Sequence, residues 1–191
     1  MKYAITGGIG SGKSFYCRQL QAAGHPIFYC DDEAKRIIRT SEAVKRELSA
    51  LVGDDVYDAA GTLQKPVLAA YICRGKQYAE RVDAIVHPRV AAAFREWAAV
   101  QEQVYEHVFM ECALLYESGF ENLVDQVILV TASQETRVRR VMARDQVTRE
   151  KALAWMALQM PETEKIKRAH HIIYSETDGK LDNPLFLPIE S

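Results

Sequence analysis

Apolar residues gather in five short runs along the chain, separated by longer stretches with helical spacing. The runs are 2–6, 26–30, 105–110, 125–131 and 171–174, and 125–131 (DQVILVT) is the clearest. Between them the pattern predicts helices over 12–23, most of 33–97, 134–143 and 148–169. Short apolar strands that alternate with helices predict a parallel sheet covered on both faces, an α/β fold.

Composition places the chain among ordinary globular proteins. It has 191 residues, 48% of them hydrophobic and 26% charged, with a formal net charge of −2. This size predicts one domain with room for insertions. The nearly balanced charge provides no general attraction for nucleic acid or an anionic membrane, so neither is expected as a partner. An anionic substrate would have to be bound by a local site.

Cysteine spacing and the lengths of the apolar runs bear on where the protein works. The four cysteines show no C-x-x-C spacing, which argues against a zinc site or a disulfide framework. The N-terminus lacks the apolar core of a signal peptide, and no run approaches the ~18–20 apolar residues that span a bilayer. We therefore expect a soluble, cytoplasmic protein. Near the C-terminus, Asn183–Pro188 is expected to form an extended, packed segment.

The strongest motif is Gly7–Ser14 (GGIGSGKS), called the phosphate loop below, which matches G-x-x-x-x-G-K-S between a predicted strand and a predicted helix. Glycines let successive N–H groups point at phosphate oxygens, and the helix adds its positive N-terminal end. Lys13 is expected to reach the β- and γ-phosphates, and the Ser14 hydroxyl to bind Mg²⁺. The setting disfavours a glycine-rich turn without a ligand. The predicted ATP-binding residues here are Gly8, Ile9, Gly10, Ser11, Gly12, Lys13 and Ser14.

The rest of the chain narrows the class of nucleotide-binding protein. A guanine-specific GTPase would need an N-K-x-D segment, which is missing, and a transporter-type ATPase would need a longer chain. A helical insertion between the second and third strands suits a small kinase that phosphorylates a metabolite. Asp31 and Asp32 follow the second strand, where a carboxylate could accept the proton of an acceptor hydroxyl. The simpler interpretation is that they cap the following helix.

The opening run Thr6–Ser14 resembles that of the dephospho-CoA kinase family. Further segments resemble the family in the same order over about residues 3–174: Cys30-Asp31 with Ala34-Lys35, Gly61-Thr62-Leu63, His87-Pro88, Leu114–Glu117, Met142–Asp145 with Arg149-Glu150, and Gln159–Pro161. Their ordered combination is specific, although no short piece beyond the phosphate loop is decisive. The resemblance implies a kinase that uses ATP and Mg²⁺ to phosphorylate the ribose 3′-hydroxyl of dephospho-CoA, the last step of CoA biosynthesis.

The resemblance also implies an architecture, a three-layer P-loop fold with a parallel five-stranded sheet. The nucleotide-binding core would comprise 1–30, 104–133 and 170–191. A helical substrate-binding insertion would span 31–103, and a lid with its following helix would span 134–169. A monomer or small homo-oligomer is expected.

On the acceptor side, the family resemblance assigns three residues by position. Asp31 matches the base for the 3′-hydroxyl, and Lys35 belongs to the same matched segment. His87 matches the family's His-Pro pair in the substrate domain. A lone histidine is more often a cap or a packed core residue than a catalytic group, so that interpretation stays open for His87.

On the phosphate side, Arg140 and Arg144 match lid arginines that bind ATP phosphates. Their spacing of four puts both on one helix face, and Arg137 joins them there. Guanidinium groups supply the charge stabilisation that phosphoryl transfer requires, so Arg140 is grouped with Lys13 and Asp31 as catalytic. A solvated helix face is the simpler interpretation. Glu111 ends the third strand, where it could hold Mg²⁺ through water or merely face solvent.

Departures from the family pattern keep two alternatives open. Tyr29 replaces an aspartate, Ala113 a proline, and His170 and Ser175 an aspartate and an asparagine near the loop expected to contact adenine. These changes fit a nucleotide- or CoA-binding regulator that has lost catalysis. A kinase for a different small acceptor is the other alternative, because the acceptor pocket is the least readable part of the sequence.

Overall fold

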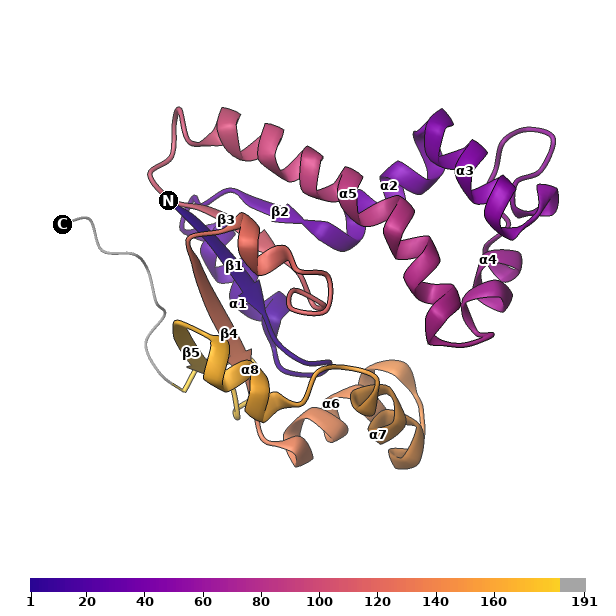
Figure 1. Cartoon of the computed structure of the whole chain (residues 1–191). Helices are drawn as coiled ribbons and strands as arrows, with labels where there is room; N and C mark the ends of the chain where they lie inside the picture. The colour runs from indigo at the N-terminus through magenta and orange to yellow at the C-terminus, as the bar shows by residue number, and fades with distance from the viewer. Residues whose placement is uncertain (183–191) are drawn as a thin grey trace. The chain divides into compact units, whose positions relative to one another are not determined.

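The computed structural model describes residues 1–182, so the predicted extended segment Asn183–Pro188 lies outside the described residues. The chain forms two compact units. One comprises Met1–Phe28 and the chain from Trp97 onward, and the other is Tyr29–Glu96. Figure 1 shows strands in the first unit and helices in the second.

The core of the first unit is a five-stranded sheet with the order β2-β3-β1-β4-β5. Its strands are β1 (Lys2–Thr6), β2 (Ile27–Tyr29), β3 (Val108–Glu111), β4 (Gln126–Thr131) and β5 (His171–Tyr174). All but the first residue of β1 are buried, and β1 pairs in parallel with both β3 and β4, as expected of a central parallel strand. The predicted α/β fold with a parallel five-stranded sheet is confirmed.

Four helices belong wholly to the first unit: α1 (Lys13–Ala22), α6 (Gln134–Asp145), α7 (Arg149–Ala157) and α8 (Glu162–Arg168). A short 3₁₀ helix, η2 (Phe120–Leu123), precedes β4. Helix α1 buries Tyr16, Cys17 and Leu20 on one face. Helices α6 and α7 lie side by side, joined by a core of Val138, Val141 and Ala152 (Figure 1).

Three predicted boundaries were wrong. The single helix over 148–169 is two helices, because Pro161 has no N–H to donate and restricts the residue before it. The strand predicted from 105 starts only at Val108, because Tyr105 donates its N–H to Gln101 in a turn at the end of a helix. Cys30 begins a helix instead of ending the strand 26–30.

The second unit is helical, as predicted for most of 33–97. It contains α2 (Cys30–Thr40), α3 (Glu42–Val52), the 3₁₀ turn η1 (Asp54–Val56), α4 (Lys65–Ile72) and most of α5 (Lys76–Gln101). Its buried side chains include Ile37, Val44, Leu48, Leu68 and Phe94. The Ser41 hydroxyl caps α3 by accepting the N–H of Val44, which ends α2 and starts α3 within one residue.

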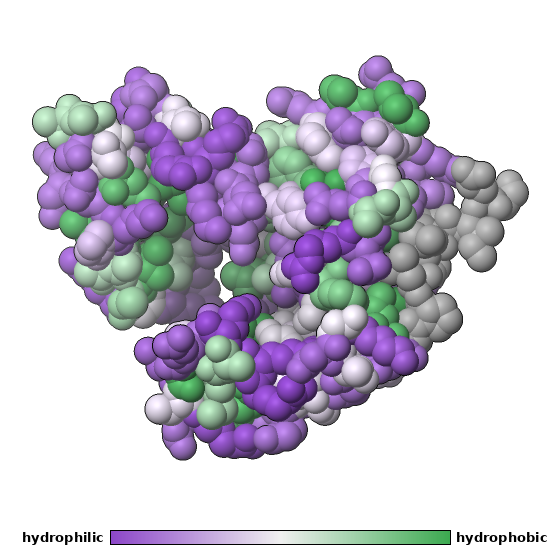
Figure 2. All heavy atoms as spheres, turned by 180° about the vertical axis from the view of Figure 1, so that it is seen from behind, coloured by the Kyte–Doolittle hydropathy of each residue, from purple (hydrophilic) through white to green (hydrophobic). Residues whose placement is uncertain are grey.

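The surface is mostly hydrophilic on the face shown in Figure 2, and the length and apolar character of the helices bear on membrane crossing. Figure 2 shows hydrophilic side chains over most of the visible face, with hydrophobic ones in small separate patches. Within residues 1–182, none of the helices combines the length and the apolar character that crossing a membrane requires.

Candidate active site

The phosphate loop connects β1 to α1, and its glycines are required by close contacts. Gly7 has φ +154° and lies against the Val130 carbonyl oxygen, which a Cβ would strike. Gly10 has φ +79°, and a Cβ there would lie 2.6 Å from the Arg137 carbonyl oxygen. Both positions therefore exclude a side chain, on conformational and steric grounds. The tight turn that the motif predicts is therefore present, and anion binding by its N–H groups stays a prediction.

Lys13 and Ser14 form the first two residues of α1, where the helix presents its positive end. The Lys13 ammonium donates to the Gly7 carbonyl oxygen at 2.9 Å, so the side chain folds back over the loop. Ser14 is exposed. Ser11 is buried, and its hydroxyl has no hydrogen-bond partner among the described residues. The loop thus combines a lysine with polar groups that a bound anion could satisfy.

Arg137 braces the loop from α6. Its side chain is only 8% exposed, Nε donates to the Ile9 carbonyl oxygen at 3.0 Å, and Nη1 pairs with Glu162 at 2.9 Å. Glu162 also accepts from the Thr131 hydroxyl at 2.5 Å, which ties the pair to the end of β4. The sequence placed Arg137 among lid arginines on a helix face. In the structure it is a buried structural contact of the phosphate loop.

Gln159, in the connection between α7 and α8, holds the same loop residue from another direction. Its Oε1 accepts the N–H of Ile9 at 2.8 Å, so this amide is engaged within the protein. The Ile9 side chain packs against the core shared by α6 and α7. Both backbone polar groups of Ile9, together with its side chain, are therefore held by the segment 134–169.

Lys165 is a buried lysine close to the loop. Its side chain is 0% exposed, and Nζ lies 4.0 Å from Glu117 with no hydrogen-bond partner among the described residues. Burial lowers the pKa of this amine, the carboxylates of Glu117 and Glu162 oppose the shift, and the positive charge of Lys13 adds to it. Lys165 therefore lies close enough to Lys13 for the two amines to interact, and its burial disfavours the charged form.

The two arginines predicted to bind ATP phosphates differ in position. Arg140 Nη1 donates to the Gly10 carbonyl oxygen at 3.3 Å, and its side chain is 17% exposed. Arg144 is 62% exposed and forms a two-point ion pair with its neighbour Asp145. The structure brings Arg140 to the phosphate loop, while a phosphate contact by Arg144 stays a prediction.

Oxygen donors suited to Mg²⁺ lie near the start of α1. Glu111 ends β3 opposite Ile5 of β1, the strand that leads into the loop. Burial raises the pKa of the Cys17 thiol to about 12; the negative charge of Glu111 adds to the shift and the positive charge of Lys13 opposes it. Glu111 and Lys13 therefore both lie near Cys17. A carboxylate and the Ser14 hydroxyl fit a hard cation. Within residues 1–182, no three His, Cys, Asp or Glu side chains gather closely enough to hold a metal by themselves.

The predicted acceptor residues belong to the second unit. Asp31 and Lys35 lie in the first two turns of α2 and are exposed, and Lys35 pairs with Asp32 at 3.3 Å. His87 lies within α5, half-buried, with Nε2 3.4 Å from Asp83. The helix-cap interpretation of the aspartates is not supported, because Tyr29 occupies the cap position and both aspartates lie inside the first turn of α2.

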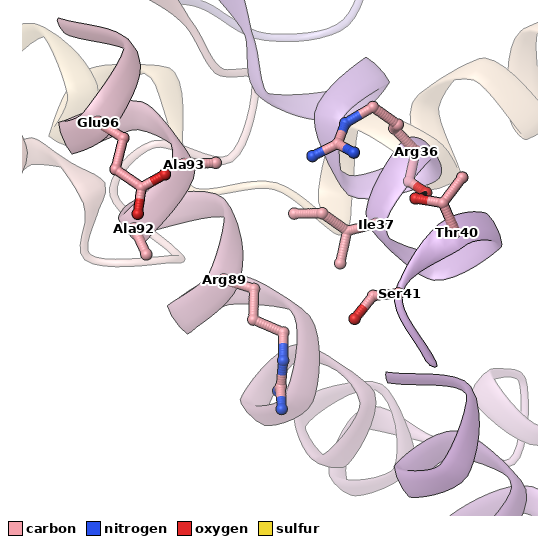
Figure 3. A pocket seen from close by; sticks show the side chains of 8 residues that line it. All are labelled: Arg36, Ile37, Thr40, Ser41, Arg89, Ala92, Ala93 and Glu96. Carbon is pink, nitrogen blue, oxygen red and sulfur yellow. Dashed lines mark hydrogen bonds between the residues drawn. The ribbon is translucent and has the colours of Figure 1, made fainter. Parts of the chain in front are cut away.

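The second unit also contains a pocket of about 350 Å³ between α2 and α5. Figure 3 shows Arg36 and Ile37 on one side and Arg89 and Glu96 on the other. Both arginines form ion pairs, Arg36 with Glu33 at 2.6 Å and Arg89 with Glu47 at 2.5 Å. The pocket is therefore polar at its rim and carries balanced charge.

The sequence did not indicate that Gln159 supports the loop, nor that the side chains of Lys165 and Arg137 are buried. Gln159 lay in a matched segment, yet its type and position gave no sign of a partner 150 residues earlier. Lys165 lies in the charged run ETEKIKR, whose polarity predicts exposure. The burial of Arg137 is equally invisible, since its neighbours Val138 and Val141 carry the apolar pattern of α6.

Comparisons with known proteins agree with this geometry. A family model described as dephospho-CoA kinase matches residues 1–181. The dephospho-CoA kinase of Bacteroides fragilis strain YCH46 is 38% identical over 181 residues, covering 95% of this chain and 87% of that protein. A crystal structure from Thermus thermophilus has a TM-score of 0.76 at 36% identity, covering 90% of this chain and 86% of that one. A dephospho-CoA kinase from Campylobacter jejuni has a TM-score of 0.68 at 25% identity, covering 91% and 88%. With its phosphate loop and parallel sheet, the chain belongs to the dephospho-CoA kinase family.

Proposed function

We propose that this protein transfers the γ-phosphoryl group of ATP to the ribose 3′-hydroxyl of dephospho-CoA, giving CoA and ADP. The observation that carries the proposal is the phosphate loop, with Lys13 folded over it and Arg140 against Gly10, in a chain of this family. The reaction is the final step of CoA biosynthesis.

On the phosphate side, catalysis would rest on positioning and charge. The loop N–H groups other than those of Ile9 and Ser11, which are bonded within the protein, and the positive end of α1 would hold the β- and γ-phosphates. Lys13 would move from the Gly7 carbonyl oxygen to a phosphate oxygen. Arg140 would stabilise the charge on the transferred group. Mg²⁺, when bound, would neutralise phosphate charge, with the Ser14 hydroxyl as a ligand and Glu111 acting through water.

On the acceptor side, Asp31 would accept the proton of the 3′-hydroxyl as it attacks the γ-phosphate. Lys35 and His87 would bind the acceptor from α2 and α5. We assign the pocket between these helices to the acceptor as well, because none of its lining residues comes from the phosphate loop or from α6. The helical insertion 31–103 would then be the substrate-binding part, and 134–169 a lid over ATP that excludes water.

Two further properties belong to this proposal. We place the protein in the cytoplasm, in line with four cysteines that are all free thiols, three of them buried. We also expect a monomer or small homo-oligomer, which sedimentation would measure directly.

A single assay separates this function from its alternatives. The protein is given ATP and Mg²⁺, and ADP formation is compared with dephospho-CoA, with other small alcohol acceptors and with no acceptor. ADP that appears only with dephospho-CoA supports the proposal, and ADP that requires another acceptor contradicts its acceptor. The Lys13→Ala variant should reduce ADP formation to background, because it removes a direct phosphate contact. No ADP with any acceptor would favour a regulator.

A further inference from the structure

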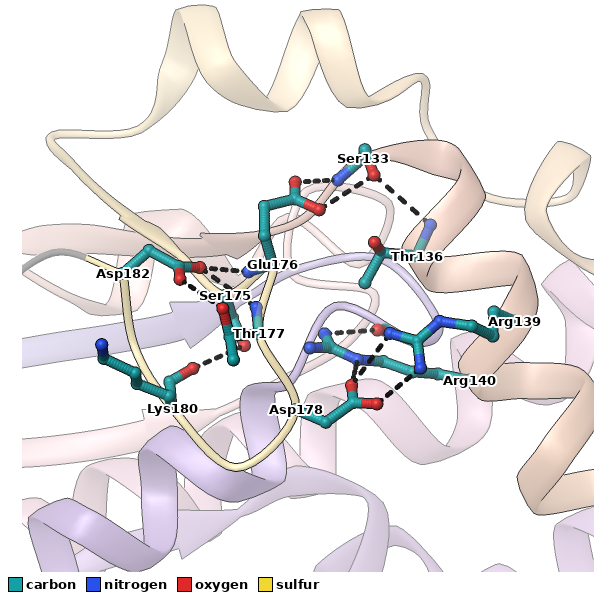
Figure 4. A network of polar contacts seen from close by, with 11 residues as sticks. Ser133, Thr136, Arg139, Arg140, Ser175, Glu176, Thr177, Asp178, Lys180 and Asp182 are labelled. Carbon is teal, nitrogen blue, oxygen red and sulfur yellow. Dashed lines mark hydrogen bonds and ion pairs between the residues drawn. The ribbon is translucent and has the colours of Figure 1, made fainter.

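The loop that follows β5 turns back onto α6 and holds it at two places (Figure 4). Near the start of α6, the Glu176 carboxylate accepts from the N–H and the hydroxyl of Ser133. Further along, the Asp178 carboxylate accepts from Arg139 Nη1 at 2.6 Å and from Arg140 Nε at 2.7 Å. A single carboxylate therefore joins two neighbouring arginines of α6.

The loop itself is well defined, so Asp178 is presented in a fixed direction. The Asp182 carboxylate accepts from the Thr177 hydroxyl at 3.0 Å and from the Glu176 N–H. Its own N–H donates to the Tyr174 carbonyl oxygen at 2.9 Å, and the Lys180 N–H donates to the Thr177 carbonyl oxygen at 3.2 Å. These bonds close the turn that carries Asp178.

Arg140 is held at two of its nitrogens. Asp178 fixes Nε, and the Gly10 carbonyl oxygen accepts from Nη1 at 3.3 Å. Because a guanidinium is rigid and planar, two fixed nitrogens set the orientation of the whole group. The remaining N–H groups of Arg140 are then available beside the phosphate loop.

We propose that Asp178 is a positioning residue for phosphoryl transfer, which orients the Arg140 guanidinium toward the transferred phosphate. This inference rests on the proposed function of Arg140. In this proposal Asp178 acts on phosphoryl transfer through Arg140, whatever other residues of its loop contribute to adenine binding. The two arginines lower the pKa of Asp178 to about 2, so its carboxylate is charged throughout the physiological range.

The opposite role is physically conceivable, because a carboxylate near the loop can withhold Arg140 from ATP. The two roles predict opposite results. Positioning predicts that Asp178→Ala lowers kcat, whereas withholding predicts faster turnover or tighter ATP binding. Asp178 is 55% exposed, so its removal should leave thermal stability nearly unchanged under either role.

The experiment measures kcat and KM for Asp178→Ala, Arg140→Ala, the double variant and Glu176→Ala. Asp178→Ala should lower kcat about tenfold, within the ~10²-fold that a 1 Å misplacement can cost, with KM for dephospho-CoA unchanged. The double variant should be no slower than Arg140→Ala, since Asp178 acts through that residue. Glu176→Ala is the matched control, because it frees the same loop from Ser133 without touching Arg140. Since this loop is expected to contact adenine, KM for ATP is measured separately, and kcat is the quantity that should stay at the wild-type value.

Several results would overturn the inference. These are a wild-type or higher kcat for Asp178→Ala, equal losses in Asp178→Ala and Glu176→Ala, or additive losses in the double variant. If the wild-type protein forms no CoA, the proposed function fails instead. The Nε–H resonance of Arg140 in ¹⁵N-arginine-labelled protein then tests the contact separately. The chemical shift of this resonance should change in Asp178→Ala and stay the same in Glu176→Ala. An unchanged chemical shift in Asp178→Ala would contradict the hydrogen bond between Asp178 and Arg140.

Discussion

Arg137 on α6 donates its Nε–H to the carbonyl oxygen of Ile9 at 3.0 Å, across a separation of 128 residues in the sequence. The same guanidinium pairs with Glu162 at the start of α8. The shape of the phosphate loop is therefore tied to the helices that follow β4. Because this guanidinium is engaged within the protein, we assign the phosphate contacts to Lys13 and Arg140 instead.

Replacing Arg137 should destabilise the fold. Arg137→Met leaves the Glu162 carboxylate largely buried without its cation, and the expected loss is about 3 kcal/mol in the free energy of unfolding. Arg149→Met is the matched control, because it breaks an exposed pair with Glu135 and should cost much less stability than Arg137→Met. Urea unfolding measures both variants. Equal losses would show that the Arg137 pair is no stronger than a surface pair.

Replacing Gln159 should disturb ATP binding more than acceptor binding. Gln159→Leu leaves the Ile9 N–H without an acceptor, a change that costs about 1–3 kcal/mol when the group is buried. Because this strain falls on the phosphate loop, we expect KM for ATP to rise several-fold while KM for dephospho-CoA stays unchanged. Gln103→Leu, at an exposed turn, serves as the control. A larger effect on dephospho-CoA than on ATP would contradict this assignment.

Asp31→Asn should keep ATP affinity and lower turnover by ~10²–10⁴-fold, the range for losing a general base. Asparagine preserves the size of the side chain but cannot accept the proton of the 3′-hydroxyl. Asp32→Asn, at the next position of α2, should have much the smaller effect. ATP affinity is measured by calorimetry and turnover by CoA formation. Unchanged turnover in Asp31→Asn would remove Asp31 from the mechanism.

The buried amine of Lys165 should give the protein a pH-dependent stability. Its pKa in the folded state lies below the ordinary value of 10.5, so between those two values the unfolded chain binds more protons. Stability then rises with pH across that window, and below the folded pKa the penalty for a buried charge is present in full. We expect the free energy of unfolding of the wild type, relative to Lys165→Met, to rise as the pH approaches 10.5. A constant difference from pH 7 upward would contradict the shift.

The parts of the fold that could be predicted from the sequence are those with a local signal. Strand β4 is a continuous apolar run, and the phosphate loop has a motif whose glycines are required by contacts with Val130 and Arg137. The break at Pro161 was readable in principle, yet the apolar spacing before it resembled a continuing helix. That boundary is set by the proline, which has no N–H to donate, and not by the spacing of the apolar residues.

The supports of the site depend on partners that are distant in the sequence. Gln159 and Asp178 form hydrogen bonds with residues far away in the sequence, and Lys165 is buried, and the local pattern indicates none of these. Their roles follow from the order of the strands, which brings the end of β4 and the loop after β5 beside the phosphate loop. The polar contacts between residues far apart in the sequence therefore could not be predicted from the sequence.

We propose that the protein phosphorylates one hydroxyl of one acceptor. The most direct measurement is ³¹P NMR of the product formed from ATP, Mg²⁺ and dephospho-CoA, together with its comparison to authentic CoA. We expect a new phosphomonoester on the ribose 3′-oxygen, formed in equal amount with ADP and absent when Lys13→Ala replaces the wild type. A phosphate on any other oxygen, or ADP without a phosphorylated acceptor, would contradict it.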